Sequence, residues 1–265
     1  MSDQRSSEYL STLEKGLRVL KSFSRENPRM TLTEVARVTE LNPAVARRCL
    51  ITLCELGYVG KEDNFFLLRP SVLELSTPFT DSFNIDNIIR PSLLSLRDQT
   101  GDSASFAVLA GSDVLYVNHV STHRAIRLQA SSGTRFPALA TSLGRAILSA
   151  LSEGEIDAFL FRYPLTARTR LTITDPAGLK RVIMQAKTQG FAVVSDELDY
   201  GVTSIACPVV IPGHGIVGAL NSSSSTNLVE IDRFTESQAP LLFSIRDHLV
   251  EELRNAPELV RALSL

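Results

Sequence analysis

Residues 31–60, TLTEVARVTELNPAVARRCLITLCELGYVG, decide the fold of the N-terminal part of the chain. Thr31 and Glu34 have the spacing of a capping box and precede an apolar run, so a short helix begins there. Asn42-Pro43 supplies an N-cap followed by proline at the first helical position, which predicts a second helix. The connection between them is tight, which is the arrangement of a helix-turn-helix.

The flanking segments extend this unit in both directions. Upstream, apolar residues recur at helical spacing and predict another helix that is ended by Asn27-Pro28. These apolar residues are Leu13, Leu17, Leu20 and Phe23. Downstream, the helix that starts at Pro43 stops at Gly57, and residues 58–61 and 65–68 read as a β-hairpin joined by Glu62-Asp63-Asn64. The first seventy residues are therefore predicted to form three helices and a hairpin.

The two faces of the helix that starts at Pro43 differ in chemistry. On a wheel of 100° per residue, one side is apolar and carries Ala46, Cys49, Leu50, Leu53 and Leu56. The opposite side carries Ala44, Arg47, Arg48, Ile51 and Glu55. A small residue beside two arginines suits insertion into the major groove, where arginine pairs with guanine edges or phosphates. On spacing alone, a plain packing module with a solvated Arg-Arg face is the alternative.

In the DNA-binding interpretation the hairpin is a wing, with Lys61 and Asn64 near the flanking DNA backbone. The expected DNA contacts are Thr31, Thr33, Asn42, Ala44, Arg47, Arg48, Lys61 and Asn64.

The rest of the chain alternates strands and helices. Residues 70–100 read as helical, interrupted at Pro78 and restarted near Ile85. The predicted strands are 106–109, 114–120, 125–130, 191–194, 205–211 and 216–220, and the predicted helices are 141–151, 153–162, 175–189 and about 230–254. This alternation predicts an α+β domain. We expect a DNA-binding domain over 1–70, a linker helix over 71–84 and a second domain over 85–265.

Composition limits the class of protein. The chain has 265 residues, of which 44% are apolar and 21% are charged, so it can build a real core in one or two domains. Its net charge of −2 argues against a chain that is basic throughout, yet residues 1–70 carry 11 Lys or Arg against 9 Asp or Glu. The three cysteines have no metal-ligand spacing, and no run approaches the roughly 18 apolar residues of a membrane span. We expect a soluble, cytoplasmic protein with reduced thiols and no metal.

One segment of the second domain predicts a site for an anion. Thr141-Ser142 precedes an apolar run, so a helix starts there with free backbone N–H groups and the positive end of its dipole. A carboxylate binds well to such a helix start. An ordinary Thr or Ser cap that serves only the helix is the alternative.

Other motifs are set aside. Residues 213–218 match G-x-G-x-x-G, but the segment continues as a strand, so we interpret it as a hairpin turn and not a nucleotide site. His119 and His123 lie on strand and loop, where a spacing of four does not present two imidazoles to one metal. The acidic group Asp196, Glu197 and Asp199 is expected to be solvated or structural rather than catalytic, with a role in gating a bound effector as the alternative. No G-x-S-x-G motif is present, so we assign no catalytic residue and no cofactor.

The chain resembles the IclR family of bacterial transcriptional regulators from about residue 10 to 254. In the N-terminal part the resemblance rests on LEKGLRVLKSF, on residues 30–59 and on FFLLRPSVLEL. Further on it rests on SFAVLAGSDVLYVNHV, LQASSGTRFPALATSLGRAILSAL, ITDPAGLKRVIMQAKTQGFAVVSDELDYGVTSIACPV and GIVGALNSSSS. The resemblance implies a winged helix-turn-helix joined by a linker helix to a GAF-like mixed α/β ligand-binding domain. Within the family, the chain is most similar to regulators of protocatechuate, 4-hydroxybenzoate and β-ketoadipate catabolism.

The resemblance also implies where a ligand carboxylate is held. Carried over by position, Ser142 and Leu143 supply amides, while Leu128 and Phe136 line an apolar wall. The pocket is closed by Val202, Ser204, Asn221 and Ser223. Val194 stands where some relatives have an acidic residue, and Asn221 replaces a serine. A less acidic pocket favours a ring-bearing acid such as 4-hydroxybenzoate or protocatechuate over glyoxylate or pyruvate.

We therefore expect a DNA-binding transcriptional regulator controlled by a small organic acid. Symmetric DNA half-sites call for a homodimer, and the family resemblance implies dimers or dimers of dimers, with no membrane partner. The alternatives from other classes are a small-molecule-modifying enzyme with a fused DNA-binding head and a purely dimerising interaction protein.

Overall fold

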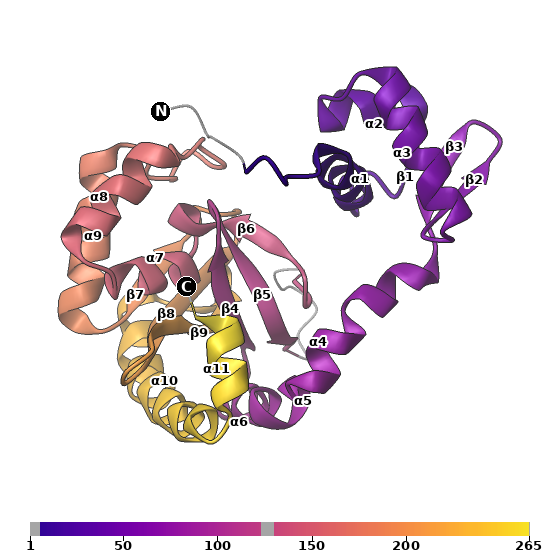
Figure 1. The fold of residues 1–265 in the computed structure, drawn as a ribbon. Helices are drawn as coiled ribbons and strands as arrows, with labels where there is room; N and C mark the ends of the chain where they lie inside the picture. The colour runs from indigo at the N-terminus through magenta and orange to yellow at the C-terminus, as the bar shows by residue number, and fades with distance from the viewer. Residues whose placement is uncertain (1–5, 123–129, 265) are drawn as a thin grey trace. The chain divides into compact units, whose positions relative to one another are not determined.

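The structure is a computed structural model that describes residues 6–122 and 130–264. The chain divides into two compact units, one ending at Ser82 and the other beginning at Phe83. Figure 1 shows helices and a small sheet in the first unit and a larger sheet covered by helices in the second. Each unit is described by itself.

The N-terminal unit contains three helices and a small antiparallel sheet. The helices are α1 (Ser11–Lys21), α2 (Leu32–Thr39) and α3 (Pro43–Glu55), and the strands are β1 (Arg29–Thr31), β2 (Val59–Glu62) and β3 (Phe65–Leu68), in the order β1-β3-β2. A 3₁₀ segment (Pro70–Leu75) and α4 (Thr77–Ser82) follow. The three helices and the hairpin are confirmed, whereas β1 was not predicted because a three-residue strand carries almost no periodicity.

Both predicted helix starts are confirmed by their caps. The Thr31 hydroxyl accepts from the Glu34 N–H at 3.3 Å, while the Glu34 carboxylate accepts from the Thr31 N–H at 2.7 Å. The Asn42 side-chain oxygen accepts from the Ala44 N–H at 2.9 Å, with Pro43 at the first helical position. These caps satisfy N–H groups that have no acceptor within their own helix.

The predicted apolar face of α1 is wrong in part. Leu13 and Leu17 are 61% and 42% exposed, whereas Val19 and Phe23 are buried. The helix ends at Lys21 rather than continuing to Asn27-Pro28. The apolar residues of α1 form two faces. Only one of these faces packs against α3 in the core of the N-terminal unit.

Leu56 is a second correction. It was expected on the buried side of α3, but it is 62% exposed. It caps the helix, and the chain reverses at Gly57 with φ +79°. The Leu56 N–H still bonds to the Thr52 carbonyl as in a helix, but the part of α3 that packs in the core of this unit ends before this position, so its side chain faces solvent.

The C-terminal unit is built on a six-stranded sheet in the order β6-β5-β4-β9-β8-β7, with every neighbouring pair antiparallel. The strands are β4 (Ser103–Ala110), β5 (Asp113–Val120), β6 (Arg135–Pro137), β7 (Ala192–Ser195), β8 (Val202–Ile211) and β9 (Gly215–Ser225). The helices are α5 (Ile85–Ile88), α6 (Arg90–Thr100), α7 (Ser142–Ser149), α8 (Glu153–Arg162), α9 (Pro176–Gln189), α10 (Ile231–Arg254) and α11 (Pro257–Leu263), and a 3₁₀ turn (Ala138–Ala140) precedes α7.

Each face of the sheet has its own hydrophobic core. One core joins β4, β8 and β9 to α5, α6, α10 and α11, and the other joins the opposite sheet face to α7, α8 and α9. Figure 1 shows α7, α8 and α9 on one side of the sheet and α6, α10 and α11 on the other. The expected α+β class is confirmed.

Several predicted boundaries in this unit change. Pro78 does not interrupt a helix but lies in the first turn of α4, where its missing N–H costs nothing. β9 runs through the serine run to Ser225, and the short β6 and the C-terminal α11 were not predicted. The predicted strand 125–130 falls on residues outside the described ranges except for Ala130, which lies in no strand.

All three cysteines are free thiols, and Cys207 lies in the core. Burial raises the pKa of the Cys207 thiol to about 12. Because the thiol ionises near pH 9 in the unfolded chain, the stability that its neutral form contributes is present below pH 9 and is lost as the pH rises toward 12. No helix in the described residues is long and apolar enough to span a membrane, and no cluster of metal-ligating side chains is found among them.

We expect a disulfide-exchange reagent at pH 8 to modify Cys207 only after unfolding, because in the folded protein its side chain is fully buried and its raised pKa keeps the thiol protonated. Counting the modified thiols in native and denatured protein measures this, with the half-buried Cys54 as the internal control. Equal reaction rates for all three thiols would contradict the prediction.

Candidate functional site

The exposed face of α3 presents two arginines. Ala44, Arg47, Arg48 and Ile51 are exposed, while Ala46 on the other side of the helix is fully buried. Within the described chain, neither guanidinium forms an ion pair or a hydrogen bond. Both arginines are therefore available to an external anion.

The other residues expected to contact DNA lie in the same unit. Thr33 is exposed in the first turn of α2, Lys61 is exposed on β2, and Asn64 is exposed at the turn between β2 and β3. The side chains of Thr31 and Asn42 are occupied by the caps of α2 and α3. Thr31 and Asn42 therefore orient α2 and α3.

Two further cations that lie against the hairpin, Arg29 on β1 and Arg69 just after β3, were missed by sequence reasoning. The Arg29 guanidinium lies 4.8 Å from the centre of the Phe65 ring, a cation–π contact from β1 to β3. Arg69 lies against the backbone of Gly60, since a Cβ on Gly60 would be 2.2 Å from its Nε. Without β1, nothing in the sequence brings Arg29 to the hairpin.

The start of α7 has the features of an anion site. Thr141 is the N-cap, and its hydroxyl accepts from the Gly144 N–H at 3.0 Å. The N–H groups of Ser142 and Leu143, at the first two helical positions, have no acceptor within the helix. The Ser142 hydroxyl donates to the Ser204 hydroxyl at 2.9 Å, which links the helix start to β8.

A closed cavity lies at this helix start. It is lined by Tyr116, Ala140, Thr141, Ser142, Val194, Leu198, Val202, Ser204, Asn221 and Ser223. The strand register explains why three of these meet: Val194 on β7 pairs with Ser204 on β8, which pairs with Ser223 on β9. Side chains on one face of neighbouring strands stand in a row, and here the row ends under α7.

Most of the residues assigned to a ligand pocket from the sequence come together here, but not all. Ser142, Val194, Val202, Ser204, Asn221 and Ser223 line the cavity. The side chain of Leu143 packs in the core under α7. The Phe136 ring packs edge-on against the Tyr116 ring, with 5.5 Å between the ring centres. Leu128 lies outside the described residues. Tyr116 and Leu198 were missed because they lie far along the chain from the other lining residues. Ala140 was also missed, and Thr141 was named only as part of the helix start.

The cavity has polar and apolar parts. The Asn221 side chain is 2% exposed, and its Oδ1 has no hydrogen-bond partner among the described residues. A buried unpaired amide oxygen is costly, so this group calls for a donor from outside the chain. Burial raises the pKa of the Tyr116 phenol, which keeps it neutral. Val194, Leu198 and Val202 form the apolar wall.

The cavity is nearly filled. Only about 10 Å³ of its space admits the centre of a water molecule. That is room for one water. A ring-sized molecule needs a wall to move.

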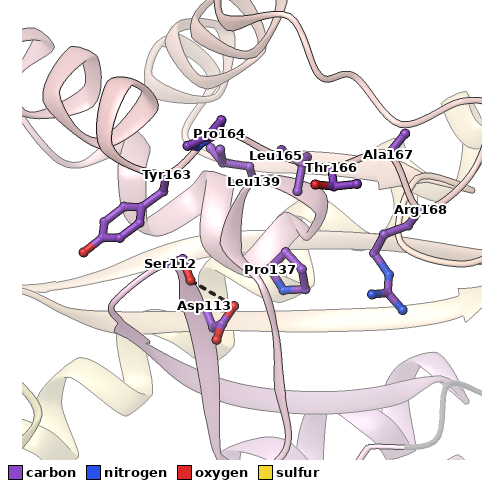
Figure 2. Close-up of a pocket in the computed structure, with 10 residues that line it drawn as sticks. All are labelled: Ser112, Asp113, Pro137, Leu139, Tyr163, Pro164, Leu165, Thr166, Ala167 and Arg168. Atoms are coloured by element: carbon purple, nitrogen blue, oxygen red, sulfur yellow. Dashed lines mark hydrogen bonds between the residues drawn. The ribbon is translucent and has the colours of Figure 1, made fainter. Parts of the chain in front are cut away.

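A second, open pocket of about 510 Å³ lies between β5, β6 and the segment after α8 (Figure 2). It is lined by Ser112, Asp113, Pro137, Leu139 and residues 163–168. In Figure 2, Tyr163 and Arg168 lie at opposite ends of the pocket, and Ser112 bonds to Asp113. Because this pocket is open to solvent, it desolvates a ligand poorly.

The motifs that the sequence set aside have structural roles. Residues 212–214 form the turn between the antiparallel β8 and β9, and residues 215–218 begin β9, which confirms the hairpin interpretation. The His119 ring bonds to the hydroxyls of Ser105 and Ser121, and His123 lies outside the described residues. In the acidic group, Glu197 is buried in an ion pair with Arg145, while Asp199 is exposed.

Comparison with known proteins assigns both units. The family model of the IclR helix-turn-helix domain matches residues 12–63, and that of the C-terminal domain of the bacterial transcriptional regulator IclR matches residues 78–247. The Pca regulon regulatory protein of Pseudomonas putida is 33% identical, with 93% of this chain and 85% of that protein covered. The p-hydroxybenzoate hydroxylase transcriptional activator of Acinetobacter baylyi is 30% identical, with 95% and 93% covered.

A solved structure shows the same fold. The crystal structure of an IclR homologue from Microbacterium hydrocarbonoxydans, complexed with 4-hydroxybenzoate, matches with a TM-score of 0.75. It is 22% identical to this chain, and the match covers 92% of this chain and 99% of that one.

Proposed function

Because the chain belongs to the IclR family of bacterial transcriptional regulators, we propose that its binding to promoter DNA is controlled by a hydroxylated aromatic acid held in the closed cavity. The observation that carries this proposal is the unpaired Oδ1 of Asn221 in a cavity that begins at the N-terminus of α7. We assign the DNA-binding domain to residues 1–70, the linker to 71–84 and the effector domain to 85–265. The protein acts in the cytoplasm, where promoter DNA is found.

The DNA contacts are those of the helix-turn-helix. Arg47 and Arg48 enter the major groove, where the small Ala44 lets the start of α3 come close to the DNA. The flanking DNA backbone is contacted by Thr33, Lys61 and Asn64. Thr31 and Asn42 contribute through the caps that orient α2 and α3. The two exposed arginines without protein partners support this assignment.

We propose a homodimer, alone or as a dimer of dimers. Two-fold DNA half-sites require two heads, and α1 with the residue before it carries an apolar face that no other described residue of its unit covers. This face consists of Leu10, Leu13 and Leu17, which are 70%, 61% and 42% exposed. Its burial against a second copy would remove that apolar surface from water.

The effector carries a carboxylate and a ring hydroxyl. The carboxylate binds the N–H groups of Ser142 and Leu143 at the positive end of α7. The ring packs against Val194 and Val202, and its hydroxyl donates to Asn221. The names of two relatives link them to Pca genes and to p-hydroxybenzoate hydroxylase, and the Microbacterium homologue was solved with 4-hydroxybenzoate.

A gel-shift of the intergenic DNA beside the gene, with a panel of acids, tests the proposal. We expect specific retardation that 4-hydroxybenzoate or protocatechuate changes, with micromolar binding by calorimetry. Binding of glyoxylate or pyruvate without binding of either aromatic acid would overturn the effector class. Turnover of the acid would favour an enzyme, and the absence of retardation would contradict DNA binding.

Replacing Asn221 by leucine is expected to weaken 4-hydroxybenzoate binding by at least about tenfold, because it removes the acceptor and fills the cavity. DNA binding without effector should be unchanged. Asn227→Leu, at an exposed position after β9, is the matched control. Equal effector affinity in Asn221→Leu and wild type would remove Asn221 from the site.

A further inference from the structure

A buried ion pair lies one turn along α7 from the cavity. Two guanidinium nitrogens of Arg145 donate to the two carboxylate oxygens of Glu197, each at 2.7 Å. The Arg145 and Glu197 side chains are 2% and 8% exposed. Arg145 Nε also donates to the Leu139 carbonyl at 2.9 Å, and Glu197 also accepts from the Ile173 N–H at 2.9 Å.

Stability alone does not account for this pair. Moving two charged side chains out of water costs free energy that the burial of an apolar pair of the same size does not. This cost is offset only when every charged atom of the pair has a well-placed hydrogen-bond partner. The geometry here is complete, since the fork of arginine matches both carboxylate oxygens. Such a pair defines one position of the two segments that it joins. The segments are therefore held in register.

The segment held by Glu197 is a wall of the cavity. Leu198 follows Glu197 and lines the cavity directly. Leu198 lies in the bend between β7 and β8, whereas the other lining residues lie on strands or at the start of α7. Because the strands and the helix are bound along their length, a ring-sized ligand requires this bend to move, and the side-chain contacts of the bend decide whether it can.

The same bend is fastened at three successive carbonyls. Thr169 donates to the carbonyl of Asp196 at 2.6 Å, Thr172 to that of Glu197 at 2.7 Å, and Arg168 Nε to that of Leu198 at 3.1 Å. Residues 168–173 and 196–198 thus move together or not at all. Arg145 is the charged side chain that ties this pair of segments to α7.

We propose that the Arg145–Glu197 pair is a latch that holds the Leu198 wall closed and sets which size of acid the cavity admits. This rests on the proposed effector function. Opening the wall far enough for a ring strains or breaks the latch. The observed affinity for the acid is then the intrinsic affinity of the open form multiplied by the fraction of molecules that are open. Arg145 and Glu197 are positioning residues and do not touch the acid.

The test replaces both charges, with Arg145→Met and Glu197→Met in one chain, so that neither is left unpaired. Arg145→Lys is the milder second variant, because it keeps the charge but loses the fork. The control neutralises the exposed pair of α8 and α9 by Asp157→Met and Lys180→Met, whose atoms lie 2.8 Å apart. Hydrogen exchange of residues 196–201 is measured without ligand, and calorimetry measures 4-hydroxybenzoate and 6-hydroxy-2-naphthoate.

In the double variant we expect exchange at residues 196–201 to rise at least tenfold, selectively, and the larger naphthoate to bind at least tenfold more tightly than it binds wild type. Arg145→Lys should lie between, and the control should match wild type. Unchanged exchange at 196–201, a rise shared by the whole domain, or unchanged naphthoate affinity would overturn the latch. If wild type binds neither acid, the effector proposal fails, while the exchange measurement still decides whether the wall is latched.

Discussion

Replacing both Arg47 and Arg48 by alanine is expected to reduce operator affinity by at least about 100-fold, without loss of folding. Each arginine that pairs with a base edge contributes about 1–3 kcal/mol, and both side chains are exposed and unpaired in the described chain. Since neither contributes to the core of the N-terminal unit, the melting temperature should not change. Fluorescence anisotropy with labelled operator DNA measures the loss.

The single variants separate two kinds of contact. Loss of Arg47 or Arg48 at a base edge relaxes specificity at one base pair, whereas loss of a phosphate contact weakens all sequences alike and lowers the salt slope by about one. Arg181→Ala, which removes an exposed cation of α9, is the matched control. If the double variant bound its operator as tightly as the control does, α3 would not be the recognition helix.

Replacing Gly144 by alanine is expected to destabilise the C-terminal domain by about 3 kcal/mol or more. A Cβ on Gly144 would lie 2.1 Å from the carbonyl oxygen and 2.4 Å from the Cα of Ala138. These are backbone atoms, so the contact is relieved only by moving the turn before α7 or α7 itself. Because that movement displaces the N–H groups of Ser142 and Leu143, effector binding should be lost as well.

Thermal unfolding measures the first effect, and 3 kcal/mol corresponds to a fall of about 6–12 °C for a domain of this size. Gly154→Ala is the control, because it also lies in a helix and its Cβ would meet nothing within 4 Å. The control should be neutral or stabilising, by up to about 1 kcal/mol. A Gly144→Ala protein as stable as the control would show that α7 and the turn before it separate freely.

Local chemistry was predictable from the sequence. Thr31 with Glu34, and Asn42 with Pro43, define helix starts within four residues of chain, so the helix-turn-helix could be located before any packing was known. The division of α3 into a polar face and an apolar face follows from the period of the helix alone. The start of α7 at Thr141 was predictable for the same reason.

The cavity was less predictable. The helix start at Thr141-Ser142 was predicted from the residues alone, whereas Ser204 and Asn221 came from the family resemblance, since nothing local brings residues from α7, β8 and β9 together. Tyr116 and Leu198 were missed. Glu197 was assigned only to an acidic group, because its partner Arg145 lies 52 residues away in the chain.

By itself the sequence determined where α2, α3 and α7 begin, which face of α3 is polar and that a helix-turn-helix is followed by a part that mixes strands and helices, because caps and periodicity act over a few residues. Only the tertiary structure decided that Leu13 and Leu17 stay uncovered within their unit, that Asn221 is buried without a partner, and that Arg145 is paired with Glu197. Burial and charge pairing depend on which segments meet. Strand register and helix packing decide those meetings over distances that no local pattern encodes.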